Sequence, residues 1–167
     1  MRVVAFDPGV LNLGVCLMSR DEPPHLDVVQ ADDLDTFIES MRKFEPVISK
    51  SDIVAIESQP PMNRAATKIS NWIELFTRLH SSASIVFVSP AARVSRTRLV
   101  VDLQKNAPYR DRKAASVDAV TLLYGETIWA NVKSKRDDAA DALLIALIAS
   151  ERSDPDQNKK NVGHSRR

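Results

Sequence analysis

The chain has 167 residues, of which 44% are hydrophobic and 27% are charged, and this composition fits one globular domain with a sizeable core. A single cysteine, Cys16, excludes an intramolecular disulfide framework and a cysteine-based zinc finger, and it favours a reducing, intracellular compartment. No apolar run reaches the roughly 18 residues of a membrane span. The first apolar segment breaks at Asp7-Pro8, so we expect neither a signal peptide nor a membrane partner.

The net charge of +1 conceals a division along the chain. The net charge is −6 over residues 1–60, +2 over 61–90, +6 over 91–136 and −1 over 137–167. A basic middle between carboxylate-rich ends is typical of a protein that binds a polyanion such as nucleic acid and also has a metal site. An ordinary solvated surface is the alternative explanation of the same asymmetry.

Five short apolar segments have the pattern of strands. The first is β-branched and ends at Asp-Pro-Gly, the second follows after a tight turn, and the others are bounded by prolines or polar residues. The predicted strands cover residues 3–6, 13–18, 25–30, 53–56 and 85–88.

Apolar residues at three- and four-residue steps predict helices between and after these strands. The predicted helices cover residues 34–44, 62–80, 113–124 and 137–150, with a possible short helix around 97–104 in an otherwise irregular basic segment. The order predicts an α/β fold, a mixed sheet with helices on both faces. The domain is expected to span residues 1–152, and the polar, weakly basic segment 153–167 is expected to be a disordered tail.

Four carboxylates stand at positions that can meet. Asp7 and Glu57 each end a predicted strand, and neighbouring strand ends are about 5 Å apart. Asp138 and Asp141 lie three residues apart on the last helix, which separates them by about 60° around its axis. Clustered carboxylates repel one another unless a hard divalent cation such as Mg²⁺ relieves the repulsion. Two such ions about 4 Å apart can clamp the attacking and leaving oxygens of a phosphodiester.

Each carboxylate also has a structural explanation. Asp7 is a good turn residue before proline and glycine, and Glu57 is equally consistent with plain surface. Asp137 and Asp138 favour the first turn of a helix through its dipole. Asp141 is harder to explain in this way, because it lies among alanines and leucines where a bare charge is poorly placed. The joint pattern is more specific than any member of it.

Three motifs resemble the RuvC superfamily of Holliday junction resolvases. They are Phe6-Asp7-Pro8-Gly9 with Leu13-Gly14, Ala55-Ile56-Glu57-Ser58-Gln59, and Lys135-Arg136-Asp137-Asp138-Ala139-Ala140-Asp141-Ala142-Leu143. The segment 138–143 resembles the bacterial motif, whereas 63–68 and 135–138 look more like the poxvirus-type and mitochondrial branch. The resemblance covers roughly residues 2–150.

This resemblance implies an RNase H-like fold with five strands in the order 3-2-1-4-5. It also implies a Mg²⁺-dependent endonuclease that resolves four-way DNA junctions by paired nicks, acting as a homodimer with two metal ions per active site, for which Mn²⁺ can substitute. The family carboxylates correspond to Asp7, Glu57, Asp138 and Asp141. The spacing of the last motif also leaves an Asp137 and Asp141 pair open. The implied compartment is the cytoplasm, a viral replication site or a mitochondrion.

The resemblance further implies a catalytic lysine on the penultimate helix, which Lys113 matches. Arg110 and Arg112 are close enough in sequence to be alternatives for that role. No organic cofactor is expected.

Basic residues elsewhere are candidates for contacts with DNA phosphates, which position DNA without reading its sequence. They comprise Arg64 and Lys68, one helical turn apart near Glu57, and Arg93, Arg96, Arg98, Lys105, Arg110 and Arg112 in the basic middle. A solvated basic loop is the alternative explanation.

The helix predicted at 62–80 has the broadest apolar stripe in the chain. At this spacing such residues most often belong to a core, yet the breadth of the stripe also predicts a homodimer interface. The predicted interface residues are Ile69, Trp72, Ile73 and Phe76.

Three other functions compete with junction resolution. Another RNase H-like nuclease, acting on flaps, bulges or RNA–DNA hybrids, would use the same site residues. A non-catalytic junction-binding module would be favoured by a missing carboxylate, and none is missing. The third is a phosphate-binding protein of the actin-like or sugar-kinase-like class, whose phosphate hairpin the Asp7-Pro8-Gly9 turn with Leu13-Gly14 resembles. The two lobes of such proteins need a longer chain.

Overall fold

The computed structural model describes residues 1–153, and a five-stranded sheet forms their centre. The strands are β1 (Arg2–Pro8), β2 (Asn12–Ser19), β3 (His25–Gln30), β4 (Ile53–Glu57) and β5 (Ser84–Val88). Their spatial order, β3-β2-β1-β4-β5, confirms the predicted α/β fold of the RNase H-like type with strand order 3-2-1-4-5.

The central strand β1 sets the geometry of the sheet. It pairs antiparallel with β2 on one side and parallel with β4 on the other, and β4 pairs parallel with β5. Residues 3–8 of β1 are all buried, because helices cover both faces of the sheet. The chain therefore reverses its strand order beside β1, and ligand sites of open α/β sheets lie at such a point.

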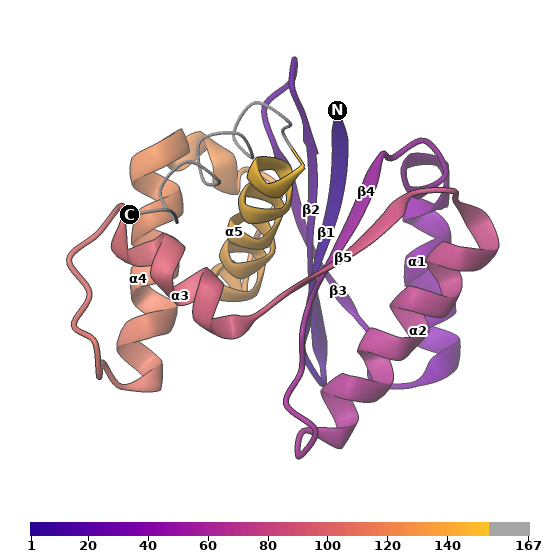
Figure 1. Cartoon of the computed structure of the whole chain (residues 1–167), viewed down its shortest axis with the longest axis horizontal. Helices are drawn as coiled ribbons and strands as arrows, with labels where there is room; N and C mark the ends of the chain where they lie inside the picture. The colour runs from indigo at the N-terminus through magenta and orange to yellow at the C-terminus, as the bar shows by residue number, and fades with distance from the viewer. Residues whose placement is uncertain (154–167) are drawn as a thin grey trace, which may run out of the picture.

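Two helices cover one face of the sheet (Figure 1). They are α1 (Leu34–Ile48) and α2 (Arg64–His80). Phe37 of α1 and Ile73 of α2 pack with Val4 and Phe6 of β1 in one buried cluster. Asp33 caps α1 and Asn63 caps α2, each accepting a hydrogen bond from a backbone N–H of the first turn.

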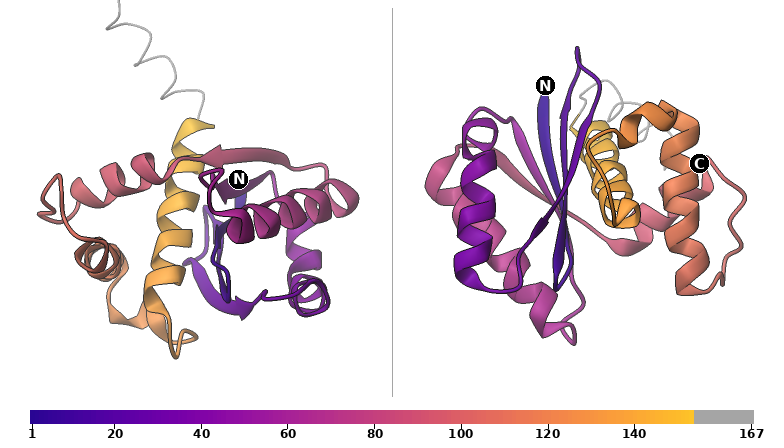
Figure 2. Two further views of the ribbon diagram at one scale, coloured as in Figure 1. Left: turned by 90° about the horizontal axis from the view of Figure 1, so that it is seen from below. Right: turned by 180° about the vertical axis from the view of Figure 1, so that it is seen from behind.

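The other face is covered by α5 (Arg136–Arg152), which runs along the sheet and is in turn covered by α3 (Pro90–Arg98) and α4 (Tyr109–Tyr124) (Figures 1 and 2). A short 3₁₀ helix, η1 (Glu126–Trp129), follows α4. Because α5 lies between the sheet and α4, it is buried nearly all round, and its many alanines permit the close packing. The predicted placement of helices on both faces is confirmed.

The structure corrects the predicted elements in the basic middle of the chain. The short helix expected around 97–104 is wrong, because the helix there is α3 at Pro90–Arg98. Ser89 caps it by accepting a hydrogen bond from the Ala92 N–H at 3.2 Å, and Pro90 is suited to the first helical turn. Helix α4 begins at Tyr109 instead of residue 113, directly after Pro108.

Apart from Ser153, the tail predicted at 153–167 lies outside the described residues. Within residues 1–153, none of the helices has the length and apolar character that crossing a membrane requires.

Candidate active site

Asp7 and Glu57 lie at one edge of the sheet because their strands are parallel neighbours. Phe6 pairs with Ile56 across β1 and β4, so the residues that follow them leave the sheet side by side. Both carboxylates are buried, with 7% and 6% of the residue surface exposed. A charged side chain is costly to bury unless it has a partner, so this edge must provide one.

Helix α5 brings Asp138 and Asp141 to the same edge. It begins after Lys135, which adopts a left-handed backbone conformation with φ of 57°, and its first turn then crosses β2 at Gly14. A Cβ atom at Gly14 would lie 2.7 Å from the carbonyl carbon of Asp138, so only glycine permits this approach. Asp141 has no exposed surface, and Asp138 is half-buried.

Lys113 of α4 joins these carboxylates through its ammonium group. Its Nζ donates hydrogen bonds to Oδ2 of Asp141 at 2.7 Å and Oδ1 of Asp138 at 3.1 Å. The same nitrogen lies 3.7 Å from a carboxylate oxygen of Asp7 and 3.7 Å from one of Asp137. Four acids therefore share one lysine, and Asp138 lies nearer to it than Asp137 does.

The neighbouring cations do not share this position. Within the described residues, neither Arg110 nor Arg112 forms an ion pair, and both are exposed. Of the three basic residues considered for the catalytic role, Lys113 is the one that the fold places against the carboxylates.

Arg93 is a second cation inside the cluster. Its Nε donates to Oε1 of Glu57 at 2.6 Å, and its Nη1 donates to Oδ1 of Asp141 at 2.5 Å. Only 12% of its side chain is exposed. Gln59 donates to the other oxygen of Glu57 at 3.2 Å. Arg93, which was expected to contact DNA phosphates from an irregular basic segment, therefore lies on a helix and is held by two carboxylates in the free protein.

A local signal in the sequence bears on the position of Arg93. Ser89-Pro90 is a helix-start pattern directly after a strand, so it places Arg93 in the first turn of α3. That turn lies beside the end of β4, because β4 and β5 are parallel neighbours that pair as far as Glu57 and Val88. Arg93 therefore follows closely after the end of a strand, and Asp7 and Glu57 also lie at strand ends.

The pKa values of these groups are perturbed by burial and by one another. Burial raises the pKa of Asp7 well above its ordinary value, and the charges of Asp141 and Glu57 raise it further. Burial also raises the pKa of Asp138, against the opposing effect of Lys113. For Arg93 and Lys113, burial lowers the pKa, but the adjacent carboxylates, Asp141 foremost, outweigh it and raise the pKa of both cations.

The donor chemistry of the cluster fits a hard divalent cation. Five carboxylates face two cations, so the edge keeps an excess of negative charge, and the charges of Asp141 and Glu57 add to the effect of burial in raising the pKa of Asp7. Carboxylate oxygens are the ligands that Mg²⁺ prefers. Within residues 1–153, no three acidic, histidine or cysteine side chains are gathered closely enough to form a ready-made metal site. Arg93 and Lys113 lie between the acids instead.

The remaining candidates for DNA contact lie on α2, α3 and the segment after α3. Arg96 pairs with Glu151 of α5 at 2.8 Å, and Arg98 donates to the carbonyls of Gln104 and Lys105. Arg64 and Lys68 are exposed on α2, where the Lys68 ammonium lies 4.6 Å from the centre of the Trp72 ring.

The predicted dimer interface needs correction for three of its four residues. Ile69, Ile73 and Phe76 are buried in the cluster beneath α1 and α2, and Phe76 packs edge-on against Phe37. They belong to the core because their side of α2 faces the sheet. Trp72 is half-buried, and the exposed apolar residues of the helix are Leu75 and Leu79.

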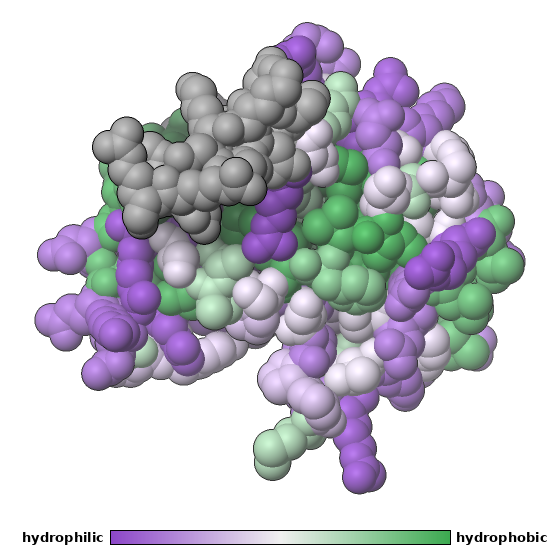
Figure 3. Space-filling view, in the orientation of Figure 1, coloured by the Kyte–Doolittle hydropathy of each residue, from purple (hydrophilic) through white to green (hydrophobic). Residues whose placement is uncertain are grey.

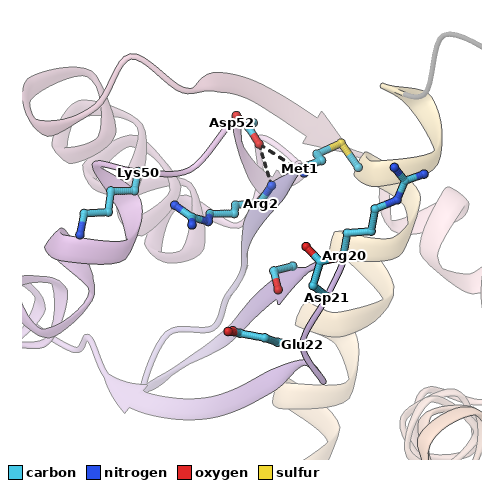
Figure 4. Close-up of a pocket in the computed structure, with 8 residues that line it drawn as sticks. Met1, Arg2, Arg20, Asp21, Glu22, Lys50 and Asp52 are labelled. Atoms are coloured by element: carbon cyan, nitrogen blue, oxygen red, sulfur yellow. Dashed lines mark hydrogen bonds and ion pairs between the residues drawn. The ribbon is translucent and has the colours of Figure 1, made fainter.

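A separate hollow of about 400 Å³ lies at the opposite edge of the sheet, where β1 begins and β2 ends (Figure 4). Its charges are mixed, with Arg2, Arg20 and Lys50 facing Asp21, Glu22 and Asp52. Asp52 is already engaged, because it accepts a 2.7 Å hydrogen bond from the Arg2 N–H. Arg2 and Asp7 stand at opposite ends of β1, so this hollow is no part of the carboxylate cluster.

The chain matches one protein family and several solved structures. The family described as "Poxvirus A22 protein" matches residues 1–151. The fowlpox virus resolvase, solved with Holliday junction DNA, has a TM-score of 0.63 and 20% identity, covering 91% of this chain and 98% of that chain. No curated protein matches the chain.

Two further solved structures share the fold. The RuvC protein of Thermus thermophilus has a TM-score of 0.58 and 17% identity, covering 90% of this chain and 93% of that chain. The yeast mitochondrial Holliday junction resolvase has a TM-score of 0.54 and 16% identity, covering 87% of this chain and 77% of that chain.

Proposed function

The chain belongs to the Poxvirus A22 protein family, and from this premise we propose that it is an endonuclease that resolves four-way DNA junctions. One observation carries the proposal: Asp7, Glu57, Asp138 and Asp141 converge with Lys113 at the edge of the sheet where β1 and β4 end. The solved proteins of similar fold named above are Holliday junction resolvases, which supports the same substrate.

Asp7, Glu57, Asp138 and Asp141 are the residues that would hold Mg²⁺ or Mn²⁺, and we propose two ions per site. When bound, these ions supply a Lewis acid for the scissile phosphate and lower the pKa of the attacking water. The carboxylates would hold the ions in place, since three of them are buried on strands and a helix of the sheet's edge. Hydrolysis in this way leaves 5′-phosphate and 3′-hydroxyl ends.

Lys113 supplies positive charge where negative charge develops on the phosphate. Its ammonium group already lies between Asp138 and Asp141, so it needs no rearrangement of the backbone to act there. The raised pKa of Lys113 keeps the group charged at neutral pH. The lysine thus neutralises a carboxylate in the free protein and a phosphate oxygen in the complex.

We propose a homodimer because a four-way junction has approximate two-fold symmetry. Two copies related by a two-fold axis present one active site to each of two opposed strands. The exposed apolar residues of α2, Leu75 and Leu79 with the half-buried Trp72, replace the buried residues first considered as the contact.

The test is incubation with a synthetic four-way junction and mapping of the cuts on every strand. We expect paired, symmetric nicks that DNA ligase can reseal, in Mg²⁺ or Mn²⁺ and not in EDTA. Because Ca²⁺ is larger and its coordination looser, we expect Ca²⁺ to support binding with little cleavage. Full activity in EDTA would refute the metal-dependent mechanism.

Flap, bulge and RNA–DNA hybrid substrates form the comparison in the same experiment. Faster cleavage of any of these than of the junction would replace junction resolution by another RNase H-like activity. Tight junction binding without cleavage in any metal would identify a binding module instead.

A further inference from the structure

A groove of about 550 Å³ lies between α3 and α4, and Lys105 and Asn106 of the segment that joins them form part of its lining. Five cations line it and no acidic residue does: Arg93, Arg98, Lys105, Arg112 and Lys113. Hydrophilic side chains gather over α3 and the neighbouring part of α4, at the left of Figure 3. Arg93 and Lys113 are paired with the carboxylate cluster, so the positive charge that favours a polyanion here comes from Arg98, Lys105 and Arg112. The volume is ample for one nucleotide.

The wall of the groove is held in place before any ligand arrives. Arg98 of α3 donates hydrogen bonds to the carbonyl of Gln104 at 3.3 Å and to that of Lys105 at 2.7 Å. These bonds fix the joining segment to α3. Among the described residues, Lys105 and Arg112 have no carboxylate partner, so their charges are available to phosphate.

Tyr109 gives the groove an aromatic surface. It is the first residue of α4, and 67% of it is exposed. The Arg112 guanidinium carbon lies 6.0 Å from the centre of its ring, and the Lys113 Nζ lies 5.9 Å from it. By contrast, Trp129 is buried and donates a hydrogen bond to Thr121, so its ring is not available to a nucleotide. An exposed ring among cations is the combination that binds single-stranded nucleic acid.

The groove opens directly onto the carboxylate cluster. Arg93 and Lys113 line the groove, and the same two side chains contact Asp141. A DNA strand lying in the groove therefore reaches the acids without passing over another element.

From these observations we propose that the groove holds an unpaired nucleotide of the strand to be cut, with its base stacked on Tyr109 and its phosphates between Lys105 and Arg112. Bases within a duplex are covered on both faces by their neighbours. Tyr109 finds a free face only where stacking is interrupted, as at the crossover of a junction. The proposal rests on the proposed function and names the feature of the substrate that the site selects.

The first test compares Tyr109→Ala with Tyr109→Phe by binding to a four-way junction and to a linear duplex of the same length. Both variants are made in the Asp7→Asn background, so that no cleavage occurs. We expect Tyr109→Ala to weaken junction binding about five-fold or more and Tyr109→Phe to change it less than about two-fold. Duplex binding stays unchanged. Leu122→Ala is the matched control, since Leu122 is an equally exposed residue of α4.

The second test needs no substitution at Tyr109. Junctions carrying 5-iododeoxyuridine at single positions near the crossover are irradiated with the Asp7→Asn protein. We expect a crosslink to Tyr109 from crossover nucleotides and none from positions within the arms. A Tyr109→Ala variant that binds junctions normally, or one that loses duplex binding equally, overturns the proposal, as does a crosslink confined to the arms. In each of these cases cleavage of junctions by the unaltered chain would leave the proposed function standing. Failure of the unaltered chain to bind or cut junctions would overturn both.

Discussion

Nη1 of Arg93 lies 2.5 Å from Oδ1 of Asp141, a carboxylate with no solvent exposure. The two residues are 48 positions apart in sequence, and the bond ties α3 to α5 across the end of the sheet. The guanidinium group of Arg93 thus lies between Glu57 and Asp141, two of the acids that would hold metal in our proposal, and it stabilises their negative charge in the metal-free protein.

Arg93→Ala is expected to destabilise the metal-free protein strongly. The substitution removes one of the two cations that contact Asp141 and the one that contacts Glu57. Asp141 is then left with Lys113 alone, and Glu57 with the Gln59 amide. Breaking a buried pair from one side costs about 3 kcal/mol, or roughly 6–12 °C in melting temperature. Arg96→Ala, one turn away, breaks the partly exposed pair with Glu151 and should cost under about 1 kcal/mol. Thermal unfolding in EDTA gives both values, and equal losses would contradict the role assigned to Arg93.

Asp7→Asn is expected to abolish junction cleavage while leaving junction binding intact. The amide keeps the size of the side chain but supplies no negative charge to a divalent cation. We expect the cleavage rate to fall at least about 100-fold. Single-turnover cleavage and a binding titration in Ca²⁺ measure the two effects separately. A variant that cuts at the normal rate would remove Asp7 from the mechanism.

The stability of the metal-free protein is expected to depend on the ionisation of Asp7. Its pKa in the folded protein is raised above the ordinary 3.8, so the fold binds the proton more tightly than the unfolded chain does. The stabilising contribution is therefore present at low pH and is lost as the pH rises through the raised pKa. Asp7→Asn should be more stable than the unaltered chain at neutral pH in EDTA, and the difference should shrink as the pH falls toward 3.8. Because the two proteins share every other titratable group, a difference in melting temperature that is constant with pH would exclude Asp7 as its source.

Gly14→Ala is expected to displace the first turn of α5 and with it Asp138. The added methyl group meets the backbone of Asp138, which is not free to move aside. We expect a loss of about 1–3 kcal/mol in unfolding free energy together with loss of cleavage. Gly125→Ala is the control: Gly125 has a φ of 77° but open space around it, so alanine strains the backbone by a similar 1–3 kcal/mol without touching the site. Equal cleavage by the two variants would contradict the prediction.

Leu75→Lys is expected to convert the dimer to monomers that lose paired nicking. Leu75 is exposed, so the substitution spares the core, whereas a charge at the buried Phe76 would damage it. Leu122→Lys on α4 is the matched control and should remain dimeric. Sedimentation velocity measures the oligomeric state, and a nicking assay on a cruciform plasmid separates single from paired cuts. An unaltered chain that is monomeric and still makes paired cuts would refute the dimer.

The strand ends made the carboxylate cluster predictable. Asp7 and Glu57 follow apolar runs directly, and Asp138 and Asp141 share one face of a helix, so local spacing already pointed to convergence. Lys113 was predicted through the family resemblance, and the structure places it against Asp141.

The contacts of Arg93 and the orientation of α2 against the sheet were harder to predict from the sequence. The bonds of Arg93 span 36 and 48 residues, and no local periodicity encodes contacts of that separation. On α2, Phe76 and Leu75 are both apolar, and the sequence pattern does not state which of them faces the sheet. The burial of Phe76 beside Phe37 decides it.

The acids of this site come from the two ends of the described chain, Asp7 from its first strand and Asp141 from its last helix. A polypeptide emerges from the ribosome with its N-terminus first. Until residues 136–152 have been synthesised and have docked on the sheet, the chain holds Asp7 and Glu57 without Asp138 and Asp141. Under the proposed function, a copy that lacks residues 136–152 lacks two of the acids that would hold the metal and is expected not to nick DNA, so the activity would arise only after this last helix has been made.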